Sequence, residues 1–183
     1  MKKRFVVGAV AFVVLLITAP VIVRGDSKDL KTGAFQIQQE VVLPATPEAV
    51  YDAVTGDISG WWDHSFSEHP KKLYIEARPG GGFYEIFNDS GDGALHATVI
   101  YAERGRMLRF TGPLGLSGQA VNFVTTYEFL PDPAGTKLRL TCNVSGQIED
   151  GQSKIVDAVW HHFLVERLKP YIESGAYKTK SKR

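Results

Sequence analysis

The sequence predicts an α+β fold in which a curved antiparallel sheet of about seven strands wraps around one long C-terminal helix. Two observations support this prediction. Six short strand patterns follow one another between Lys72 and Ser145 and are joined by turn-rich segments, which favours an antiparallel meander. A single apolar helical stripe then occupies about Asp150–Ser174, and a helix with one apolar face buries that face against another element.

The segment before the meander predicts one strand and two short helices. The first strand is expected at Ala34–Leu43, which is rich in Val and Ile with partial alternation. A helix follows in which Thr46 is the N-cap, Pro47 takes the first helical position and Gly56 ends the element. A second short helical turn is expected at Asp57–Trp62.

The meander is expected to consist of six strands with clear period-two patterning. In the last of them, Leu138, Leu140 and Cys142 point to one face, and the polar residues between them point to the other. The six predicted ranges are Lys72–Ala77, Gly82–Asn88, Ala94–Glu103, Met107–Gly112, Val121–Leu130 and Thr136–Ser145.

The C-terminal helix is predicted from its apolar residues, which recur at helical spacing. The residues expected to share its apolar face are Ile155, Val156, Val159, Trp160, Phe163 and Tyr171. Pro170 is expected to kink or shorten the helix, because proline lacks an N–H group and its ring clashes with the preceding turn. The basic tail, residues 175–183, is expected to be flexible and solvated.

The N-terminus has the pattern of an export signal. Three basic residues precede an uncharged apolar run, Phe5–Val23, which Arg24 closes, and a basic segment followed by an apolar one is typical of a signal peptide. The run is also just long enough to span a bilayer as an uncleaved anchor. We therefore expect residues 1–25 to be a signal peptide or a membrane anchor. In both cases the domain would lie outside the cytoplasm, as a periplasmic, secreted or anchored protein.

Composition excludes several classes of function. The formal net charge is +1, with 44% hydrophobic and 22% charged residues, which is typical of a globular domain and argues against a nucleic-acid-binding protein. Cys142 is the only cysteine, so an intramolecular disulfide and a cysteine-based zinc site are excluded. No glycine-rich phosphate loop opens a helix. No cofactor and no metal site is predicted.

Three stretches of the sequence resemble a known family. They are Pro44–Ala53, with the sequence PATPEAVYDA; the Trp61-Trp62 pair followed by His64-Ser65-Phe66; and Ala77–Glu85, with the sequence ARPGGGFYE. The chain resembles the helix-grip domains of the START-like (SRPBCC) superfamily over residues 34–174. Within it, the chain is most similar to the branch named after the activator of Hsp90 ATPase homologue. This superfamily includes lipid carriers, hormone receptors, cyclases and co-chaperones, so the resemblance implies a fold more than an activity.

A helix gripped by a curved sheet leaves a gap lined by apolar side chains, which is a typical small-molecule site. The resemblance implies that Trp61 and Trp62 close this gap, although simple packing of a short helix would explain either one. Arg167 would neutralise an acidic ligand group, pair with Glu85, or only extend along the helix surface. The residues expected to bind the ligand are Trp61, Trp62, Phe83, Tyr84, Phe87, Trp160, Phe163 and Arg167.

Glu85 and His64 are the candidate catalytic residues. Alternation places Glu85 on the same strand face as Phe83 and Phe87, and desolvation of a carboxylate in an apolar interior would favour its use as a proton donor or base. The alternative is a solvated or Arg-paired glutamate. His64 lies in a loop expected at the mouth of the gap, where the sequence favours an exposed, inactive histidine over a catalytic one. His96 is expected on the outer face of the sheet.

The remaining two histidines of interest are adjacent, His161 and His162. Neighbouring residues of a helix point about 100° apart, so these two form a poor pair of metal ligands.

These observations favour an exported domain that binds a hydrophobic small molecule. The alternative is a cofactor-independent, cyclase- or hydrolase-like enzyme that uses Glu85 with His64 or Tyr84 as acid and base. A third hypothesis, a partner of the Hsp90 chaperone, would require a cytosolic location.

Overall fold

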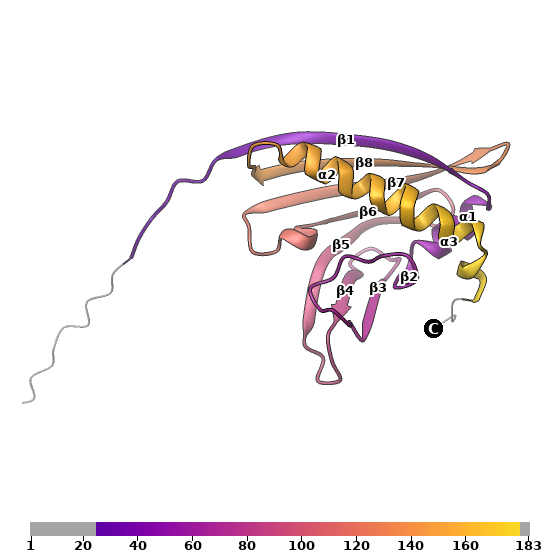
Figure 1. Cartoon of the computed structure of the whole chain (residues 1–183), viewed down its shortest axis with the longest axis horizontal. Helices are drawn as coiled ribbons and strands as arrows, with labels where there is room; N and C mark the ends of the chain where they lie inside the picture. The colour runs from indigo at the N-terminus through magenta and orange to yellow at the C-terminus, as the bar shows by residue number, and fades with distance from the viewer. Residues whose placement is uncertain (1–24, 180–183) are drawn as a thin grey trace, which may run out of the picture.

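Eight antiparallel strands form a single curved sheet in the computed structural model of the protein, which describes residues 25–179 (Figure 1). The strand order is β1-β8-β7-β6-β5-β4-β3-β2, so β2 to β8 form a meander and β1 pairs with its last strand. The strands are β1 (Thr32–Leu43), β2 (Gly56–Asp57), β3 (Lys72–Ile75), β4 (Gly82–Ile86), β5 (Gly93–Glu103), β6 (Met107–Gly112), β7 (Val121–Asp132) and β8 (Gly135–Gln147). The predicted α+β meander is confirmed, with β2 as an additional, very short strand.

Between β1 and β2 the chain forms one helix, α1 (Pro47–Ala53). Thr46 is its N-cap, as predicted, and the Thr46 hydroxyl accepts a hydrogen bond from the Ala49 N–H at 3.3 Å. The second predicted helical turn is reduced to a single turn, in which the Trp61 and Trp62 N–H groups both donate to the Ile58 carbonyl.

One long C-terminal helix crosses the sheet (Figure 1). It consists of α2 (Gln152–His161), a π-helical segment η2 (His162–Leu168) and α3 (Lys169–Glu173). The helix continues through Pro170, because the change from π- to α-helical hydrogen bonding places this proline in the first turn of α3. A proline in a first turn removes no α-helical hydrogen bond. Two short 3-10 helices, η1 (Leu114–Leu116) and η3 (Ala176–Thr179), complete the described elements.

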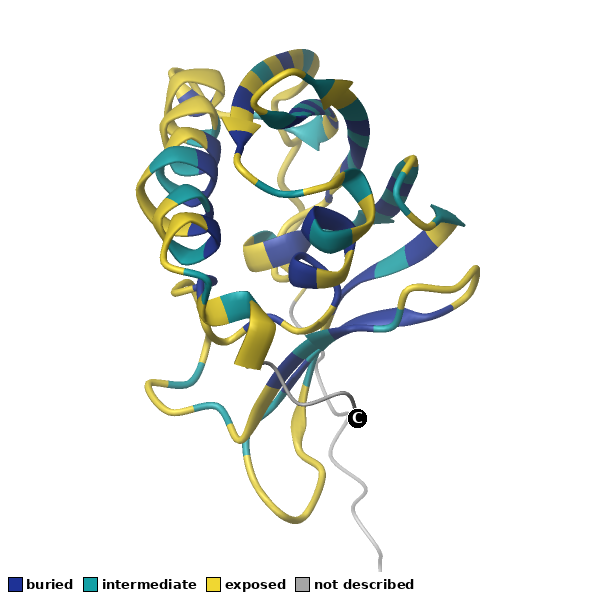
Figure 2. Ribbon diagram, turned by 90° about the vertical axis from the view of Figure 1, so that its right-hand side faces the viewer, coloured by how far each residue is buried: buried dark blue, intermediate teal, exposed yellow. Residues whose placement is uncertain are grey.

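The core lies between the long helix and the sheet. The buried residues of the helix include Trp160 and Phe163. In Figure 2 the buried segments of the helix lie on the side turned toward the rest of the domain. Ile155 departs from the predicted apolar face, because it is 64% exposed near the start of α2. Burial of the apolar face therefore begins about one turn later than its sequence pattern predicts.

The remaining predictions concern the two ends of the chain, the signal peptide or anchor and the basic tail. The predicted signal peptide or anchor lies outside the described residues, apart from Gly25. Within residues 25–179, the structure contains no helix that is both long enough and apolar enough to span a bilayer. The predicted tail begins with the short helix η3 and is described as far as Thr179.

Candidate functional site

A cavity of about 530 Å³ lies between α2 and the sheet. Its inner wall is formed by buried side chains, and its rim by exposed ones from three loops and the start of α2. The buried lining residues are Trp62, Phe83, His96, Leu114, Phe123, Gln152, Trp160 and Phe163. The exposed ones are His64, Ser65, Phe66, Gly115, Gln119, Glu149, Asp150 and Ile155. The exposed position of Ile155 is thus explained, because this side chain lies at the rim.

The inner wall is predominantly aromatic. The rings of Trp62 and Phe163 stack with their centroids 3.9 Å apart, and Phe83 and Trp160 meet the Trp62 ring edge-on at 5.1 and 6.1 Å. The Trp62 indole N–H donates to the His64 carbonyl at 2.8 Å, which satisfies its one polar group. The wall therefore offers a ligand mainly apolar surface.

Five of the predicted site residues lie together at this cavity, namely Trp62, Phe83, Trp160, Phe163 and His64. Trp61 lies behind the wall. It is 1% exposed, its indole N–H donates to the Ala53 carbonyl at 3.2 Å, and its ring packs edge-on against Trp62. Trp61 therefore packs the short helical turn against its neighbours, which was the alternative to a role in closing the gap.

The prediction that Tyr84, Phe87 and Arg167 line the cavity is wrong. Tyr84 lies on the opposite face of β4 from Phe83, where its ring pairs with Tyr74 at 5.2 Å. The alternation of β4 does not extend to Phe87, because the strand ends at Ile86. Arg167 contacts Asp63 and the Trp61 carbonyl, at 3.1 and 3.4 Å from its Nε atom, rather than Glu85 or the cavity.

Glu85 is fully buried, on the same side of β4 as Phe83, as the alternation predicts. Its carboxylate accepts three hydrogen bonds. The Phe66 N–H and the His96 Nε2 donate to Oε2 at 3.0 and 2.9 Å, and the Ser67 N–H donates to Oε1 at 2.8 Å. Both oxygens are engaged, and Glu85 lies behind the residues that line the cavity. Hydrogen bonds to the Glu85 side chain therefore hold the loop that contains Phe66 against the sheet.

His96 is the inner-wall residue that the sequence placed incorrectly. It was expected on the outer face, yet it is 5% exposed, lines the cavity and pairs with Glu85. The reason is a β-bulge: Phe83 pairs with Ala97 but Tyr84 pairs with Leu95, so His96 is the extra residue and turns inward. Its ring lies between those of Phe66 and Phe83, with both centroids 5.0 Å away.

The loop between β6 and β7 closes another side of the cavity. Leu114 has a φ of +51° and is the only non-glycine residue with positive φ within residues 25–179. This conformation is strained for a leucine. The Leu114 carbonyl lies 3.3 Å from His96 Nδ1. Both nitrogens of His96 therefore face protein acceptors.

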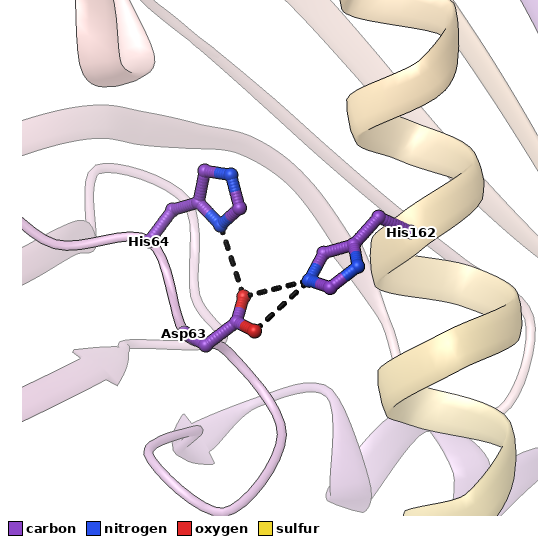
Figure 3. A group of neighbouring side chains, drawn as sticks. All are labelled: Asp63, His64 and His162. Atoms are coloured by element: carbon purple, nitrogen blue, oxygen red, sulfur yellow. Dashed lines mark hydrogen bonds and ion pairs between the residues drawn. The ribbon is translucent and has the colours of Figure 1, made fainter.

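A second polar cluster joins Asp63, His64 and His162 (Figure 3), and His64 also lines the cavity. The Asp63 carboxylate accepts from His64 Nδ1 and from His162 Nε2, both at 2.9 Å, while His162 Nδ1 lies 2.8 Å from Glu166. The sequence did not predict this cluster. The contact of His162 with Asp63 joins residues 99 positions apart, and the pairing of His162 with the adjacent His161 gives no indication of it.

The electrostatics of this cluster follow from its hydrogen bonds. Those to Glu166 and Asp63 raise the pKa of His162 above its ordinary value, because both carboxylates stabilise the imidazolium form. Burial alone would raise the pKa of Asp63, but the hydrogen bonds from His64 and His162 outweigh it, so this pKa is lowered. The loop and the long helix are thus linked by a network of charged groups.

Comparison with known proteins places the chain in a family. The family model described as activator of Hsp90 ATPase homolog 1-like protein matches residues 44–173. Among the curated proteins, none matches the chain.

Solved structures with the same fold come from several bacteria. A protein of unknown function from Staphylococcus aureus has a TM-score of 0.58 at 15% identity, with 80% of this chain and 98% of that one covered. An uncharacterised protein from Rhizobium leguminosarum has a TM-score of 0.59 at 17% identity, with coverage of 80% and 99%. A protein described as AHSA1-like, from Aeromonas hydrophila, has a TM-score of 0.54 at 19% identity, with coverage of 81% and 99%.

At these identities the structures show that the fold is shared, whereas the family model spans all the elements from α1 to α3. It also covers every residue that lines the cavity. The chain therefore belongs to the activator of Hsp90 ATPase homolog 1-like family, with the helix-grip fold.

Proposed function

We propose that the protein binds a hydrophobic small molecule in the cavity between α2 and the sheet. The observation that carries this proposal is the cavity itself, with its volume of about 530 Å³ and its aromatic inner wall. Small-molecule sites typically have volumes of roughly 300–1,000 Å³ and apolar linings with a few polar groups. This cavity agrees with that description in both respects.

The distribution of polar groups indicates how a ligand would be oriented. The inner wall is apolar apart from the engaged His96 and Gln152, whereas Gln119, Glu149 and Asp150 lie at the exposed rim. An apolar ligand body would therefore lie against Trp62 and its aromatic neighbours, with any polar end at the rim. Asp150 is paired with Lys31, so the negative charge of Glu149 makes a neutral or cationic polar end more favourable at the rim than an anionic one.

The enzymatic alternative has less support from the geometry. It requires Glu85 to face His64 or Tyr84, but the Glu85 carboxylate is bound by Phe66, Ser67 and His96. Tyr84 points to the opposite face of β4, and the Nδ1 atom of His64 contacts Asp63. The Glu85–His96 pair resembles an acid–base dyad in composition, yet its nitrogens already have protein acceptors.

We also propose that the N-terminal basic and apolar segment directs the domain out of the cytoplasm. Its support is the sequence pattern of residues 1–25. The third hypothesis, a partner of a cytosolic chaperone, depends on the opposite location. Cell fractionation of the full-length chain separates the two. Recovery of the domain outside the cytoplasmic membrane supports export, whereas an uncleaved, soluble cytosolic protein would contradict it.

Ligand binding can be tested with a neutral fluorescent probe, N-phenyl-1-naphthylamine, and two matched tryptophan substitutions. Val159 lines the cavity and Ala158, its neighbour on α2, is exposed. Val159→Trp would fill the cavity and weaken probe binding by about tenfold or more, equivalent to roughly 1.4 kcal/mol. Ala158→Trp would leave binding unchanged.

Thermal melts of both variants show whether they fold. If Val159→Trp does not fold, Val156→Phe serves the same purpose, since Val156 also lines the cavity. Probe affinity that is equal in the native protein and in a folded cavity-filling variant would refute the proposed site.

A further inference from the structure

The side chains of Asp63, His64 and His162 bring three metal-binding atoms together within 4.8 Å of one another (Figure 3). Asp63 and His64 lie on the loop after β2, and His162 begins the π-helical segment of the long helix. The three atoms are one carboxylate oxygen and two imidazole nitrogens. This cluster is separate from the buried Glu85–His96 pair and does not depend on the proposed binding of a hydrophobic ligand.

We propose that Asp63 Oδ1, His64 Nδ1 and His162 Nε2 form a site for a divalent transition-metal ion, with zinc as the best match. Two imidazoles and one carboxylate are a ligand set that zinc accepts, and three protein ligands leave a fourth position for water or another donor. Because His64 also lines the cavity, that fourth position lies near the cavity mouth.

The two distances from Asp63 to the histidines are close to those that a tetrahedral zinc site requires, and the two imidazole nitrogens lie within 4.8 Å of each other. Zinc–nitrogen and zinc–oxygen bonds of about 2.0–2.1 Å place neighbouring ligand atoms about 3.3 Å apart. In the structure, Asp63 Oδ1 lies 2.9 Å from His64 Nδ1 and 3.1 Å from His162 Nε2. Small rotations of partly exposed side chains would open these distances; the exposed fractions are 53% for His64, 33% for Asp63 and 30% for His162.

Neighbouring groups would orient two of the ligands. Glu166 Oε2 lies 2.8 Å from His162 Nδ1, and a proton held on Nδ1 leaves the lone pair of Nε2 for a metal. Histidines that bind zinc commonly donate their second N–H to a carboxylate in this way. The Arg167 guanidinium lies 3.1 Å from Asp63 Oδ2, so it engages the oxygen that the metal would not use.

The charges around the site also favour a cation. Asp63 and Glu166 contribute two negative charges, and Arg167 contributes one positive charge. Arg167 is 41% exposed, so its guanidinium can move toward solvent when a divalent ion binds. Neutral imidazoles would replace hydrogen-bond donation to Asp63 with donation of their lone pairs to the metal.

The test is calorimetric titration of the full chain, purified without a polyhistidine tag, with zinc chloride at pH 7.5. The expected result is one bound zinc ion per chain. Binding should be lost or weakened by at least the roughly 10–100-fold known for supporting residues in each of His64→Ala, His162→Ala and Asp63→Asn. Glu166→Gln should weaken it by about tenfold, because this residue only orients His162.

His161→Ala and His69→Ala are matched controls, since both residues are exposed and lie outside the cluster. They should bind zinc as the native protein does. Cobalt(II) provides a second measurement, because a change in its visible absorption on binding should disappear in the same three ligand variants. No stoichiometric binding, or unchanged zinc affinity in any folded ligand variant, would overturn the proposal.

Discussion

The loop after β2 is held to the sheet and to the long helix by two pairs of side chains. Each pair consists of a carboxylate and an imidazole, but the two pairs lie in different environments. On the sheet side, the side chains of Glu85 and His96 are 0% and 6% exposed, and the Glu85 carboxylate accepts from the Phe66 N–H. On the helix side, Asp63 and His162 are about one-third exposed. Burial, more than residue type, decides what such a pair does.

The buried pair is suited to stability. Removing one partner of a buried, hydrogen-bonded carboxylate–imidazole pair leaves an uncompensated polar group away from water, which costs about 3–5 kcal/mol. An exposed pair is screened by solvent and contributes about 0–1 kcal/mol. The exposed pair keeps solvent access, however, so its ligand atoms remain available to a metal ion. The Glu85–His96 pair therefore determines the position of the loop, and the Asp63–His162 pair is available to bind a metal ion.

The largest expected effect is that of Glu85→Gln. The substitution removes the charge that His96 and the N–H groups of Phe66 and Ser67 share, and it should lower the free energy of unfolding by about 3–5 kcal/mol. Urea denaturation measures this change, with Glu68→Gln, an exposed residue of the same loop, as the control. A loss below about 1 kcal/mol would mean that the buried pair does not hold the loop.

His96→Ala should have the next largest effect, a loss of about 1–3 kcal/mol, because Glu85 keeps its two backbone donors. His69→Ala is the control. In the double variant with Glu85→Gln, the two losses should not add, since both remove the same hydrogen bond. Additive losses would show that His96 contributes through the aromatic packing alone.

The smallest effect is expected for His162→Ala in buffer that contains a chelator. The free energy of unfolding should change by no more than about 1 kcal/mol, because the pairs with Asp63 and Glu166 are partly exposed. The difference from the native protein should shrink further in 1 M salt. His161→Ala is the control. If His162→Ala lowered the free energy of unfolding as much as Glu85→Gln does, the exposed pair would contribute as much stability as the buried one.

The sequence predicted the elements better than the site. The meander and the long helix follow from local patterns, and so does the inward position of Glu85. The same alternation already placed Tyr84 on the face opposite Phe83, so its assignment to the cavity disagreed with the pattern.

The remaining differences depend on how distant elements pair. His96 turns inward because of a bulge between β4 and β5, and a bulge depends on pairing register, which neither strand reveals alone. The cluster of Asp63 and His162 arises where the long helix crosses the loop after β2. The docking of the helix is a tertiary property, so the spacing of the histidines in the chain contained no signal for it.

Binding of a hydrophobic ligand in the cavity is tested most directly by mass spectrometry of organic extracts. The native protein and the variants Val159→Trp and Ala158→Trp would be purified from the same host with the N-terminal segment retained. An apolar compound is expected at up to one equivalent in the native and Ala158→Trp extracts, and it should be depleted in the Val159→Trp extract. Extracts of the same composition from all three folded proteins would contradict it.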